Sequence, residues 1–202
     1  MRLNFLYILK QRLKGKNFLY EFYFKNKKTL DVGCGEGEFL KFDKEKIFGI
    51  DANERAIKKL KECGYKVYLG NVTNLNFDDG EFEMVHCHNV IEHLDIDSAI
   101  KMLKESSRVL KSRGLFVLSS EVVTKEFWNT FGHIKPYPPG AILKLLRKES
   151  RESFDGLDSL EFIDVFYLGN YSKNRFIYFL NCLIAFYLPF FRREYFLVLR
   201  KK

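Results

Sequence analysis

The chain has 202 residues, of which 47% are hydrophobic and 16% aromatic, and its formal net charge is +8 at pH 7. This composition is typical of a globular chain and not of a disordered one, and the length suits one domain, or one domain with an appendage, with a sizeable core. Residues 1–28 contain eight lysine or arginine residues and one acid, Glu21, whereas the remainder is nearly balanced, with 26 basic and 25 acidic residues. We therefore predict a basic N-terminal helical segment, residues 1–28, followed by one domain, residues 29–202.

Short apolar runs bounded by turn residues predict five strands in the first 120 residues. They cover residues 28–33, 46–51, 66–71, 82–88 and 114–120. Two helical stripes lie between them: residues 53–63, with Asn53 as the N-cap, and residues 97–110, with Asp97 as the expected cap. Apolar strands that alternate with helices predict an α/β fold with a parallel sheet covered on both faces.

The pattern changes after residue 120. A proline-containing loop precedes a short predicted helix, residues 141–149, and a strand, residues 160–169. An apolar run, residues 176–191, comes before the last predicted strand. At 16 residues, with Asn181 and Pro189 inside it, the run is short for a membrane span, so we predict a buried or interfacial helix.

The four cysteines, Cys34, Cys63, Cys87 and Cys182, lie far apart and form no CxxC pair. Residues 1–28 hold basic residues throughout and lack the uninterrupted apolar stretch of a secretion signal. We therefore expect reduced thiols and a cytoplasmic protein.

The stretch TLDVGCGEGEFL, residues 29–40, places three glycines directly after the first predicted strand. Glycines there let the backbone turn sharply and approach a ligand closely. A dinucleotide fold normally spaces them G-x-G-x-x-G and sets phosphate at the helix N-terminus, but here the spacing is G-x-G-x-G. Glu36 and Glu38 would repel phosphate at that place. The loop therefore favours a nucleoside without phosphates, and a positive charge on the ligand would suit the carboxylates.

Asp51 ends the second predicted strand, 18 residues after Gly33. A carboxylate at this place can accept both hydroxyl hydrogens of a ribose. The alternative is that Asp51 only precedes the helix that Asn53 caps. S-adenosylmethionine fits the whole description, because it combines adenine, ribose and a sulfonium cation and has no phosphate.

From these residues onward the sequence resembles the class I S-adenosylmethionine-dependent methyltransferases, most closely the branch that contains ubiquinone/menaquinone-type small-molecule enzymes. LDVGCGEGEFL is similar to the first motif of the family and FGIDANERAI to the second. YLGNVTNLNFDDGEFEMVHCHNVIEHL and RVLKSRGLFVLSS resemble the stretches that follow, so the likeness covers residues 29–120. It implies a Rossmann-like, doubly wound seven-stranded sheet of order 3-2-1-4-5-7-6, with the last strand antiparallel, and S-adenosylmethionine as cofactor.

The resemblance also implies roles for individual residues by position. The methionine and ribose portions would be wrapped by the glycine loop, namely Asp31, Gly33, Cys34, Gly35, Glu36 and Gly37. Asp51 would hold the ribose, and Ala52 and Asn53 would flank the adenine. The edge of the adenine would meet Asn71, Val72 and Thr73, and the methionine end His88, Asn89 and Val90.

Two positions depart from the family pattern. The family usually has Asp where this chain has Asn71; an amide oxygen still accepts a hydrogen bond but without charge, so we expect weaker cofactor binding. The family turn K-P-G-G reads Lys111-Ser112-Arg113-Gly114 here, and we expect Gly114 to supply the permissive backbone.

Methyl transfer from a sulfonium is an in-line displacement, in which the protein mainly positions the acceptor and a base assists when the acceptor is a hydroxyl. His133 is the predicted catalytic residue, because the family branch often has a His–Pro–x–Leu pattern in the segment over the acceptor pocket. His93 and Tyr137 are the predicted substrate contacts. A packing role for His133 and Tyr137, and a structural hydrogen bond for His93, are the alternatives.

The run His86-Cys87-His88 raises the question of a metal. In a strand, His86 and His88 share one face and Cys87 points the other way, and no second ligand pair follows. We therefore expect no metal site.

The acceptor is less well defined. The segment after the fourth strand, HNVIEH, lacks the Pro–Pro–aromatic motif of base-amino methyltransferases, and no cysteine has the proline neighbour used for pyrimidine C5 methylation. Nucleic acid is therefore disfavoured as a partner, although the basic N-terminus could contact RNA phosphates.

The N-terminal segment could pack on the domain or lie on anionic lipid, with the apolar run as a second membrane surface. We therefore predict methylation, at oxygen, of a small or lipid-linked acceptor, with peripheral membrane contact. An RNA-binding methyltransferase and a catalytically inactive interaction subunit remain the alternatives, and the oligomeric state is left open.

Overall fold

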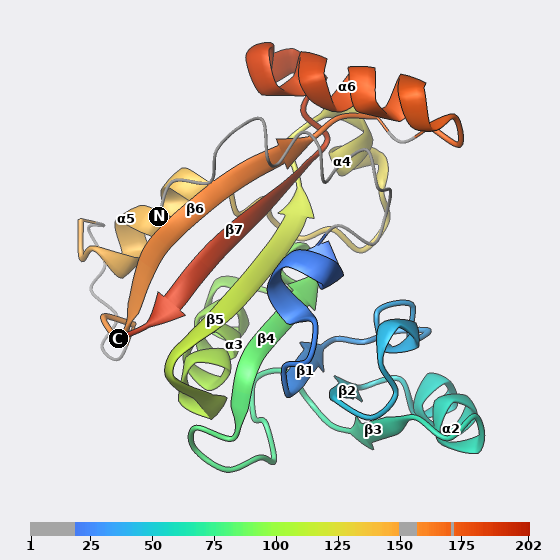
Figure 1. Cartoon of the computed structure of the whole chain (residues 1–202). Coiled ribbons are helices and arrows are strands. Elements are labelled where there is room, and N and C mark those ends of the chain that lie inside the picture. Colours follow the sequence, from blue (N-terminus) through green and yellow to red (C-terminus); the bar gives the residue numbers. More distant parts are fainter. Residues whose placement is uncertain (1–18, 150–156, 171) are drawn as a thin grey trace.

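The computed structural model describes residues 19–149, 157–170 and 172–202, which form one mixed seven-stranded sheet with helices and turns packed on both faces (Figure 1). The strand order is β3-β2-β1-β4-β5-β7-β6, which confirms the order that the resemblance implied. Five strands are mutually parallel: β1 (Thr29–Val32), β2 (Ile47–Asp51), β3 (Lys66–Leu69), β4 (Phe82–His88) and β5 (Leu110–Glu121). The last strand, β7 (Glu194–Lys201), runs antiparallel between β5 and β6 (Leu160–Leu168), as predicted.

The strands are connected by helices and short turns. The helices are α2 (Glu54–Glu62), α3 (Ile96–Val109), α4 (Lys125–Asn129), α5 (Pro139–Leu146) and α6 (Arg175–Tyr187). The short turns are η1 (Tyr20–Phe24), η2 (Leu40–Phe42), η3 (Ile91–His93) and η4 (Pro189–Phe191).

Side-chain caps fix where the two central helices begin. Asn53 caps α2 as predicted, because its Oδ1 accepts a hydrogen bond from Ala56 N at 3.1 Å. The prediction that Asp97 caps the next helix was wrong. Asp95 is the cap of α3, with its Oδ1 accepting from Ser98 N at 2.7 Å, and Asp97 lies in the first turn. Both residues are acids that suit a helix N-terminus, so the sequence pattern did not separate them.

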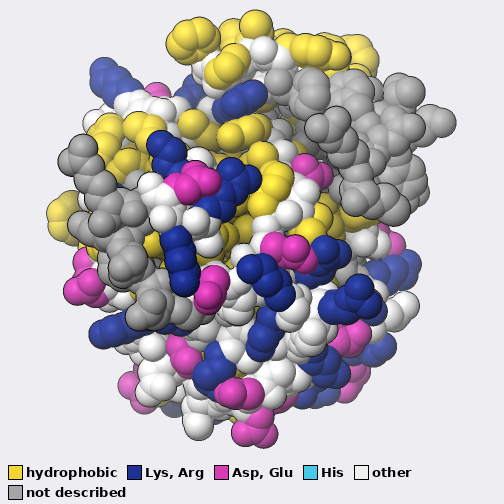
Figure 2. Space-filling model, turned by 90° about the vertical axis from the view of Figure 1, so that its left-hand side faces the viewer, with side chains coloured by type: hydrophobic (Ala, Val, Ile, Leu, Met, Phe, Trp, Pro, Cys, Tyr) yellow, Lys and Arg dark blue, Asp and Glu magenta, His cyan; other side chains and the backbone are white. Residues whose placement is uncertain are grey.

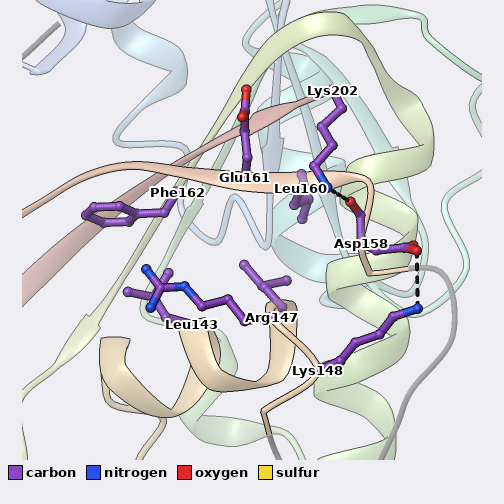
Figure 3. A pocket seen from close by; sticks show the side chains of 9 residues that line it. Leu143, Arg147, Lys148, Asp158, Leu160, Glu161, Phe162 and Lys202 are labelled. Carbon is purple, nitrogen blue, oxygen red and sulfur yellow. Dashed lines mark hydrogen bonds and ion pairs between the residues drawn. The ribbon is translucent and has the colours of Figure 1, made fainter.

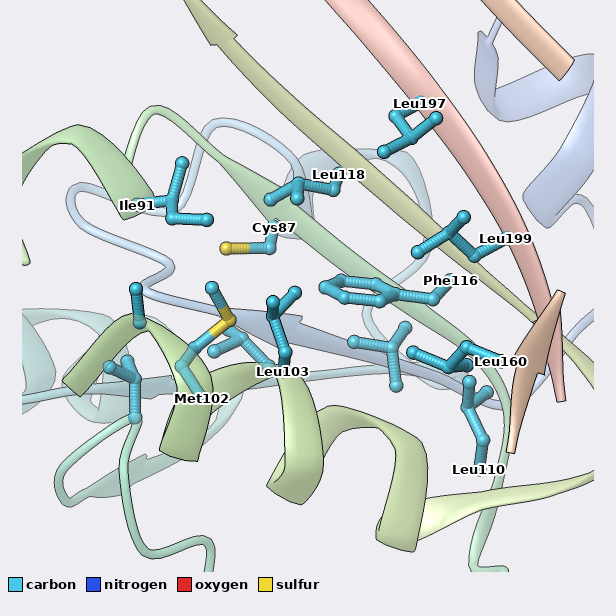
Figure 4. Packing of buried hydrophobic residues seen from close by; sticks show 14 of the residues in the cluster. Cys87, Ile91, Met102, Leu103, Leu110, Phe116, Leu118, Leu160, Leu197 and Leu199 are labelled. Atoms are coloured by element: carbon cyan, nitrogen blue, oxygen red, sulfur yellow. The ribbon is translucent and has the colours of Figure 1, made fainter. Parts of the chain in front are cut away.

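The sheet has an apolar core on each face, because successive strand side chains point to opposite sides. On one face, Phe116, Leu118, Leu197 and Leu199 pack with Leu103 of α3 (Figure 4). On the other face, the alternate residues of β5 and β7 pack with η1 and α2. Each fully buried aliphatic or aromatic side chain contributes about 1.5–3 kcal/mol, so the sheet is held from both sides.

The N-terminal prediction is only partly open to comparison, because residues 1–18 lie outside the described residues. Of the remainder, Tyr20–Phe24 form a single wide turn whose Tyr20 and Phe24 are buried against the sheet. Of the basic residues that follow, Lys25 pairs with Glu21 of the segment itself, whereas Lys27 and Lys28 pair with Glu83 and Glu81 of the main domain. A basic helix over 1–28 is therefore not confirmed.

The turn before the apolar part of β5 differs from expectation. Arg113, and not Gly114, occupies the left-handed region, with φ of 66°. A Cβ on Gly114 would lie 2.9 Å from the carbonyl oxygens of Glu83 and Lys111. Gly114 is therefore required by close backbone approach and not by an unusual φ.

The apolar run forms α6 and η4, which lie across the carboxyl end of β6 (Figure 1). Cys182 and Ala185 are buried beneath the helix, and Asn181 Nδ2 donates to the carbonyl oxygen of Asn170 at 2.8 Å. The exposed apolar side chains of this surface, which we call the α6 face, are Phe176, Ile177, Leu180, Ile184, Tyr187, Leu188, Phe190 and Phe191. Figure 2 shows hydrophobic side chains gathered at this upper end of the molecule. A fully buried helix is thus excluded, and no described helix is both long and apolar enough to cross a membrane.

Candidate functional site

A cavity of about 570 Å³ opens where the carboxyl ends of β1, β2 and β4 meet. Ligands of open parallel sheets bind at this edge, where neighbouring connections leave in opposite directions, and the volume suits a nucleoside-sized molecule. Its wall consists of Asp31, Gly33, Cys34, Gly35, Glu36, Glu38, Phe39, Asp51, Ala52, Asn71, Val72, His86, His88, Asn89, Val90, His93 and Leu94.

The glycine loop is bent tightly against β2. Gly33 N and Cys34 N both donate to the carbonyl oxygen of Ile50, at 2.8 and 3.0 Å. Gly33 has φ of 75°, and a Cβ there would lie 2.4 Å from Val90 Cγ2. A side chain at this position would therefore be strained by both the backbone and the neighbour, so glycine is needed for the shape of the cavity.

Asp51 joins two parts of the wall. Its Oδ2 accepts a hydrogen bond from Gly35 N at 2.8 Å, and its Oδ1 accepts from Asn53 N at 2.8 Å. The carboxylate thereby fixes the glycine loop to the start of α2. Each oxygen keeps lone-pair capacity after these bonds, so the carboxylate can also accept hydrogen bonds from two ligand hydroxyls.

A buried acid–imidazole pair forms the floor of the cavity. His86 Nδ1 lies 2.7 Å from Asp31 Oδ1, and both side chains are buried. The imidazole stacks on Phe39, with ring centroids 3.9 Å apart, and meets the edge of Phe24. Packing and hydrogen bond together hold Asp31 in one orientation, with its second oxygen free to face the ligand.

The two glutamates of the glycine loop are exposed and each pairs with a lysine: Glu36 with Lys59 at 3.4 Å, and Glu38 with Lys41. These pairs reduce the negative charge that the sequence alone suggested for the loop. Asp31 and Asp51 have no lysine or arginine partner within the described ranges, so the negative character of the cavity rests mainly on them.

His88 stands at the other end of the wall, between β4 and the last strands. Its Nδ1 lies 2.6 Å from Ser119 Oγ and 3.0 Å from Glu194 Oε1. Burial lowers the pKa of His88, but the hydrogen bond and charge of Glu194 raise it by more, so the pKa lies above its ordinary value. Burial, helped by the charges of Asp31 and Asp51, raises the pKa of the Cys34 thiol, which therefore stays protonated and is no nucleophile.

Most of the predicted cofactor residues line the cavity, but three lie behind its wall. Gly37 packs toward Leu60, Asn53 caps α2, and Thr73 donates through its N and Oγ1 to Asn71 Oδ1, each at 2.9 Å. The Asn71 oxygen is thus already used within its own turn. This leaves less capacity for a ligand at that position.

Only one of the three predicted acceptor residues lines the cavity. His93 lines the cavity, whereas His133 and Tyr137 lie beside it on the loop between α4 and α5. Burial raises the pKa of Tyr137, and its protonated hydroxyl donates to Leu94 O at 3.0 Å. His133 Nδ1 donates to Phe127 O at 2.9 Å. Their roles as catalytic and substrate residues stay predictions.

Sequence reasoning missed several wall residues, Glu38, Phe39, His86 and Leu94. The alternation of β4 could have found His86, because His86 and His88 share a face, and their rings are 6.0 Å apart. It also missed a group formed by Glu92, His93 and His133, which place one potential metal-ligand atom each within 4.8 Å of one another. Burial raises the pKa of Glu92.

A second cavity, of about 510 Å³, lies between α5 and the edge strand β6 (Figure 3). Its charged groups are largely engaged with one another: Lys148 Nζ lies 3.3 Å from Asp158 Oδ2, and Lys202 Nζ donates to Asp158 O. Arg147 and Phe162 complete its rim. It lacks a glycine loop and lacks carboxylates like Asp31 and Asp51, which have no described lysine or arginine partner, so we take the first cavity as the functional site.

Comparison with known proteins agrees with this choice. A family model described as a methyltransferase domain matches residues 30–118, which include the glycine loop, Asp51 and β4. A protein of Methanocaldococcus jannaschii is 32% identical over 116 residues, which are 54% of this chain and 50% of that protein. The chain spans about half the length of the curated relatives that it matches.

Solved structures show the same fold over nearly the whole chain. A protein of Archaeoglobus fulgidus, described as an S-adenosylmethionine-dependent methyltransferase, has a TM-score of 0.64 at 22% identity and covers 98% of this chain and 100% of its own. A possible histamine N-methyltransferase of Thermotoga maritima has a TM-score of 0.65 at 18% identity, with 96% and 89% coverage. At these identities the likeness describes the fold.

Proposed function

We propose that the chain is a class I S-adenosylmethionine-dependent methyltransferase that transfers the methyl group of its cofactor to an oxygen of a small, apolar acceptor, because a methyltransferase-domain model matches residues 30–118, which include the glycine loop and Asp51. The observation that supports the proposal most directly is the Asp51 carboxylate. It lies in the cavity wall, is unpaired by any described lysine or arginine, and ties the glycine loop to α2. A ribose diol is the ligand group that such a carboxylate accepts best.

The other residues of the cavity wall support the same ligand. The adenine would lie beside Ala52, Asn71 and Val72, and the methionine portion between the glycine loop and His88–Val90. Asp31 would face the positively charged groups of the cofactor, because its carboxylate is buried and held by His86.

An apolar acceptor is favoured by the segment that follows β5. Val123, Trp128, Phe131 and Ile134 are large hydrophobic side chains exposed on this segment, which also carries His133. Exposed apolar groups clustered beside a cavity mark a binding surface more often than a neutral one. The acceptor would enter past this segment and meet the methyl group near His93.

The α6 face supports a membrane or lipid source for that acceptor. It lies at the same carboxyl end of the sheet as the cavity, and Lys173, Arg192 and Arg193 flank it in the sequence. An apolar helix face bordered by basic residues is typical of peripheral attachment to anionic membranes. We propose that the protein binds membranes through this face.

The transfer itself needs little from the protein beyond position. When bound, the cofactor would supply an activated methyl group on its sulfonium, and the protein would hold the acceptor oxygen in line with the sulfur–methyl bond. The hydroxyl proton must leave to a base. His133 is the proposed base, because its Nδ1–H is held by Phe127 O, which leaves Nε2 able to accept a proton.

The decisive experiment measures S-adenosylmethionine binding by calorimetry and methyl transfer from labelled cofactor to host lipid and aqueous extracts. Asp51→Ala should lower cofactor affinity about 100-fold, since hydrogen bonds to a charged group contribute about 1.5–3 kcal/mol each. Asp43→Ala is the matched control. Asp43 also accepts hydrogen bonds from two backbone amides, Glu45 N and Lys46 N, but it lies outside the cavity.

Three outcomes would count against the proposal. Wild-type affinity in Asp51→Ala would contradict the cofactor assignment. An intact wild type that does not bind S-adenosylmethionine at all would support the inactive interaction subunit. Label in RNA, and none in small molecules, would support the RNA alternative, which rests on a segment mostly outside the described residues.

The membrane proposal has a separate test. Sedimentation with vesicles of phosphatidylglycerol and phosphatidylcholine should fall about tenfold in a Leu180→Ser, Ile184→Ser variant, because two exposed aliphatic groups are lost. Leu69→Ser is the control, because Leu69 is similarly exposed at the far edge strand β3. Equal sedimentation of all three proteins would exclude the α6 face as the contact.

A further inference from the structure

We propose that Glu92, His93 and His133 bind a divalent transition-metal ion at the acceptor side of the cofactor cavity. The three residues come from η3 and from the loop between α4 and α5. Their potential ligand atoms lie within 4.8 Å of one another. His93 also lines the cavity, so the ion would face the space where the acceptor enters.

Glu92 is the strongest single observation. Its side chain is 0% exposed, and neither carboxylate oxygen has a hydrogen-bond partner in the described structure. A buried carboxylate without a partner is costly, at several kcal/mol even after relaxation, and proteins normally resolve this with a cation or hydrogen bonds. The described residues place no lysine or arginine against it. His93 and His133 each place a potential ligand atom within 4.8 Å of a Glu92 carboxylate oxygen, and the Ser120 hydroxyl is a further polar neighbour.

Both imidazoles are prepared to act as ligands. His93 Nδ1 lies 2.9 Å from Gly132 O, and His133 Nδ1 lies 2.9 Å from Phe127 O. A carbonyl oxygen can only accept, so each Nδ1 carries the proton and each Nε2 keeps a lone pair. Metal-binding histidines almost always make this second hydrogen bond, which fixes the tautomer and the ring orientation.

The loop that carries His133 is held against η3 by independent contacts. Ile134 N donates to Glu92 O at 2.8 Å, and Tyr137 OH donates to Leu94 O at 3.0 Å. Tyr195 OH in turn donates to Tyr137 O at 2.6 Å. The two rings already lie with centroids 4.9 Å apart. Hydrogen bonds between the loop and η3 therefore keep the backbones of His93 and His133 close together.

The ligand set indicates the class of metal. Two imidazoles and one carboxylate, with further positions open, are typical of catalytic zinc and of related divalent transition metals, whereas Mg²⁺ and Ca²⁺ prefer oxygen ligands alone. Bonds of about 2.1 Å in a tetrahedral site place ligand atoms about 3.4 Å apart, so the rings would close slightly on the ion. His93 is exposed, which permits that movement.

The ion would bind the acceptor oxygen, a role that rests on the proposed O-methylation. A metal-bound hydroxyl has a lowered pKa and releases its proton to water. The resulting oxygen then forms the bond to the cofactor methyl group as the sulfur–methyl bond breaks, leaving a neutral thioether. His133 would in that case act as a ligand in place of the general base considered above.

The test measures metal binding without cofactor or acceptor. The purified full chain is stripped with a chelator, and Zn²⁺ binding is followed by calorimetry, with Co²⁺ absorption as a second readout and Mg²⁺ for comparison. We expect one Zn²⁺ per chain and no comparable Mg²⁺ binding. Glu92→Gln, His93→Gln and His133→Gln should each weaken Zn²⁺ binding about tenfold or more.

Matched controls separate this site from adventitious binding. His88→Gln removes a half-buried histidine of the same cavity, and Cys63→Ser removes the exposed thiol; neither should change the affinity for Zn²⁺. Circular dichroism checks that each variant is folded. His133→Gln, on a loop, keeps the test valid if Glu92→Gln does not fold. Absence of stoichiometric Zn²⁺ in the wild type, or wild-type binding in all folded ligand variants, would overturn the proposal.

Cofactor binding measured on the same samples keeps the two proposals apart. Zn²⁺ bound without any affinity for S-adenosylmethionine would leave the metal site standing and reject the proposed methyl transfer. S-adenosylmethionine bound by a protein that does not bind Zn²⁺ would reject the metal site and leave the proposed methyl transfer standing.

Discussion

We call the glycine loop with Asp51 the cofactor side, and the group Glu92, His93 and His133 the acceptor side, after the roles proposed for them; the two are built in different ways. On the cofactor side, hydrogen bonds from backbone amides hold the glycine loop in place: Gly33 N and Cys34 N donate to Ile50 O, and Gly35 N donates to the Asp51 carboxylate. On the acceptor side, Glu92 and His133 come from distant segments and are brought together by loop contacts and side chains. A ligand shared by many relatives can be held by backbone geometry, whereas a ligand that differs between them is held by exchangeable loops.

Gly33→Ala should break the cofactor side with the largest effect. A left-handed φ costs an alanine about 1–2 kcal/mol, and the contact with Val90 adds about 1–3 kcal/mol of overpacking. We expect lower stability in urea unfolding and at least a 100-fold loss of cofactor affinity in calorimetry. Gly35→Ala is the control, because a Cβ there meets nothing within 4 Å, so only the backbone strain remains. Equal effects of the two changes would contradict the role of the Val90 contact.

Gly169→Ala should displace α6 and leave the cofactor side intact. A Cβ on Gly169 would lie 2.3 Å from Asn181 O, so α6 would have to move away from the end of β6. The free energy of unfolding should fall by about 1–3 kcal/mol, while cofactor affinity stays within twofold of wild type. Gly140→Ala, where a Cβ meets nothing, should not destabilise the protein. A large loss of cofactor affinity in Gly169→Ala would show that the position of α6 and the cofactor side are not independent.

Asn71→Asp should sharpen the cofactor side. A charged acceptor forms a hydrogen bond roughly twice as strong as a neutral one, so we expect about 1 kcal/mol, or about fivefold, tighter binding of S-adenosylmethionine. Calorimetry measures this directly. Asn174→Asp, at the cap of α6, is the control and should leave the affinity unchanged. Unchanged or weaker binding in Asn71→Asp would mean that the Thr73 bonds occupy the carboxylate as well.

Glu194→Gln tests the junction between the two sides and should have the smallest effect. Glu194 is the main cause of the raised pKa of His88, with smaller contributions from the charges of Asp31 and Glu92. The pair therefore stabilises the fold fully below the unfolded pKa of histidine, about 6.5, and this stabilisation is lost as pH rises through the higher folded pKa. Because the His88 side chain is about half exposed, we expect less than about 1 kcal/mol. Urea unfolding at pH 6 and pH 9 should show a smaller pH dependence in the variant. An identical dependence in both proteins would contradict the assignment.

The sequence predicted that most of the cofactor-side residues lie together at one edge of the sheet, because its signals there are local. Glycines after a strand, an acid at the next strand end and alternating apolar runs each depend on neighbours in the chain, and the strand order followed from the resemblance. Local ambiguity still caused errors, as with Asp95 and Asp97 at the start of α3. Arg113 in place of Gly114 is a second example, because a turn of several residues can place its left-handed residue at more than one position.

The acceptor side could not be predicted in the same way. The approach of His133 to Glu92 depends on the conformation of the loop between α4 and α5, and the hydrophobic periodicity of the sequence does not predict that conformation. The exposure of the α6 face could not be predicted from the sequence either, because an apolar run has the same pattern of residues whether other elements cover it or not.

The position of β7 between β5 and β6 has a consequence for the order of folding. In the chain, β6 precedes β7, yet its ladder of hydrogen bonds is made with β7, so β6 has no strand partner until the later segment has been synthesised. Until β7 has been synthesised, the apolar strand β6 presents unpaired backbone groups at both edges. Because α6 lies between β6 and β7 in the chain, a second apolar segment is also exposed during this time. The half of the sheet that contains β6 and β7 is therefore open to aggregation during synthesis. The half that contains β1, β2 and β3 is not, because each of these strands can pair with its neighbour as it emerges.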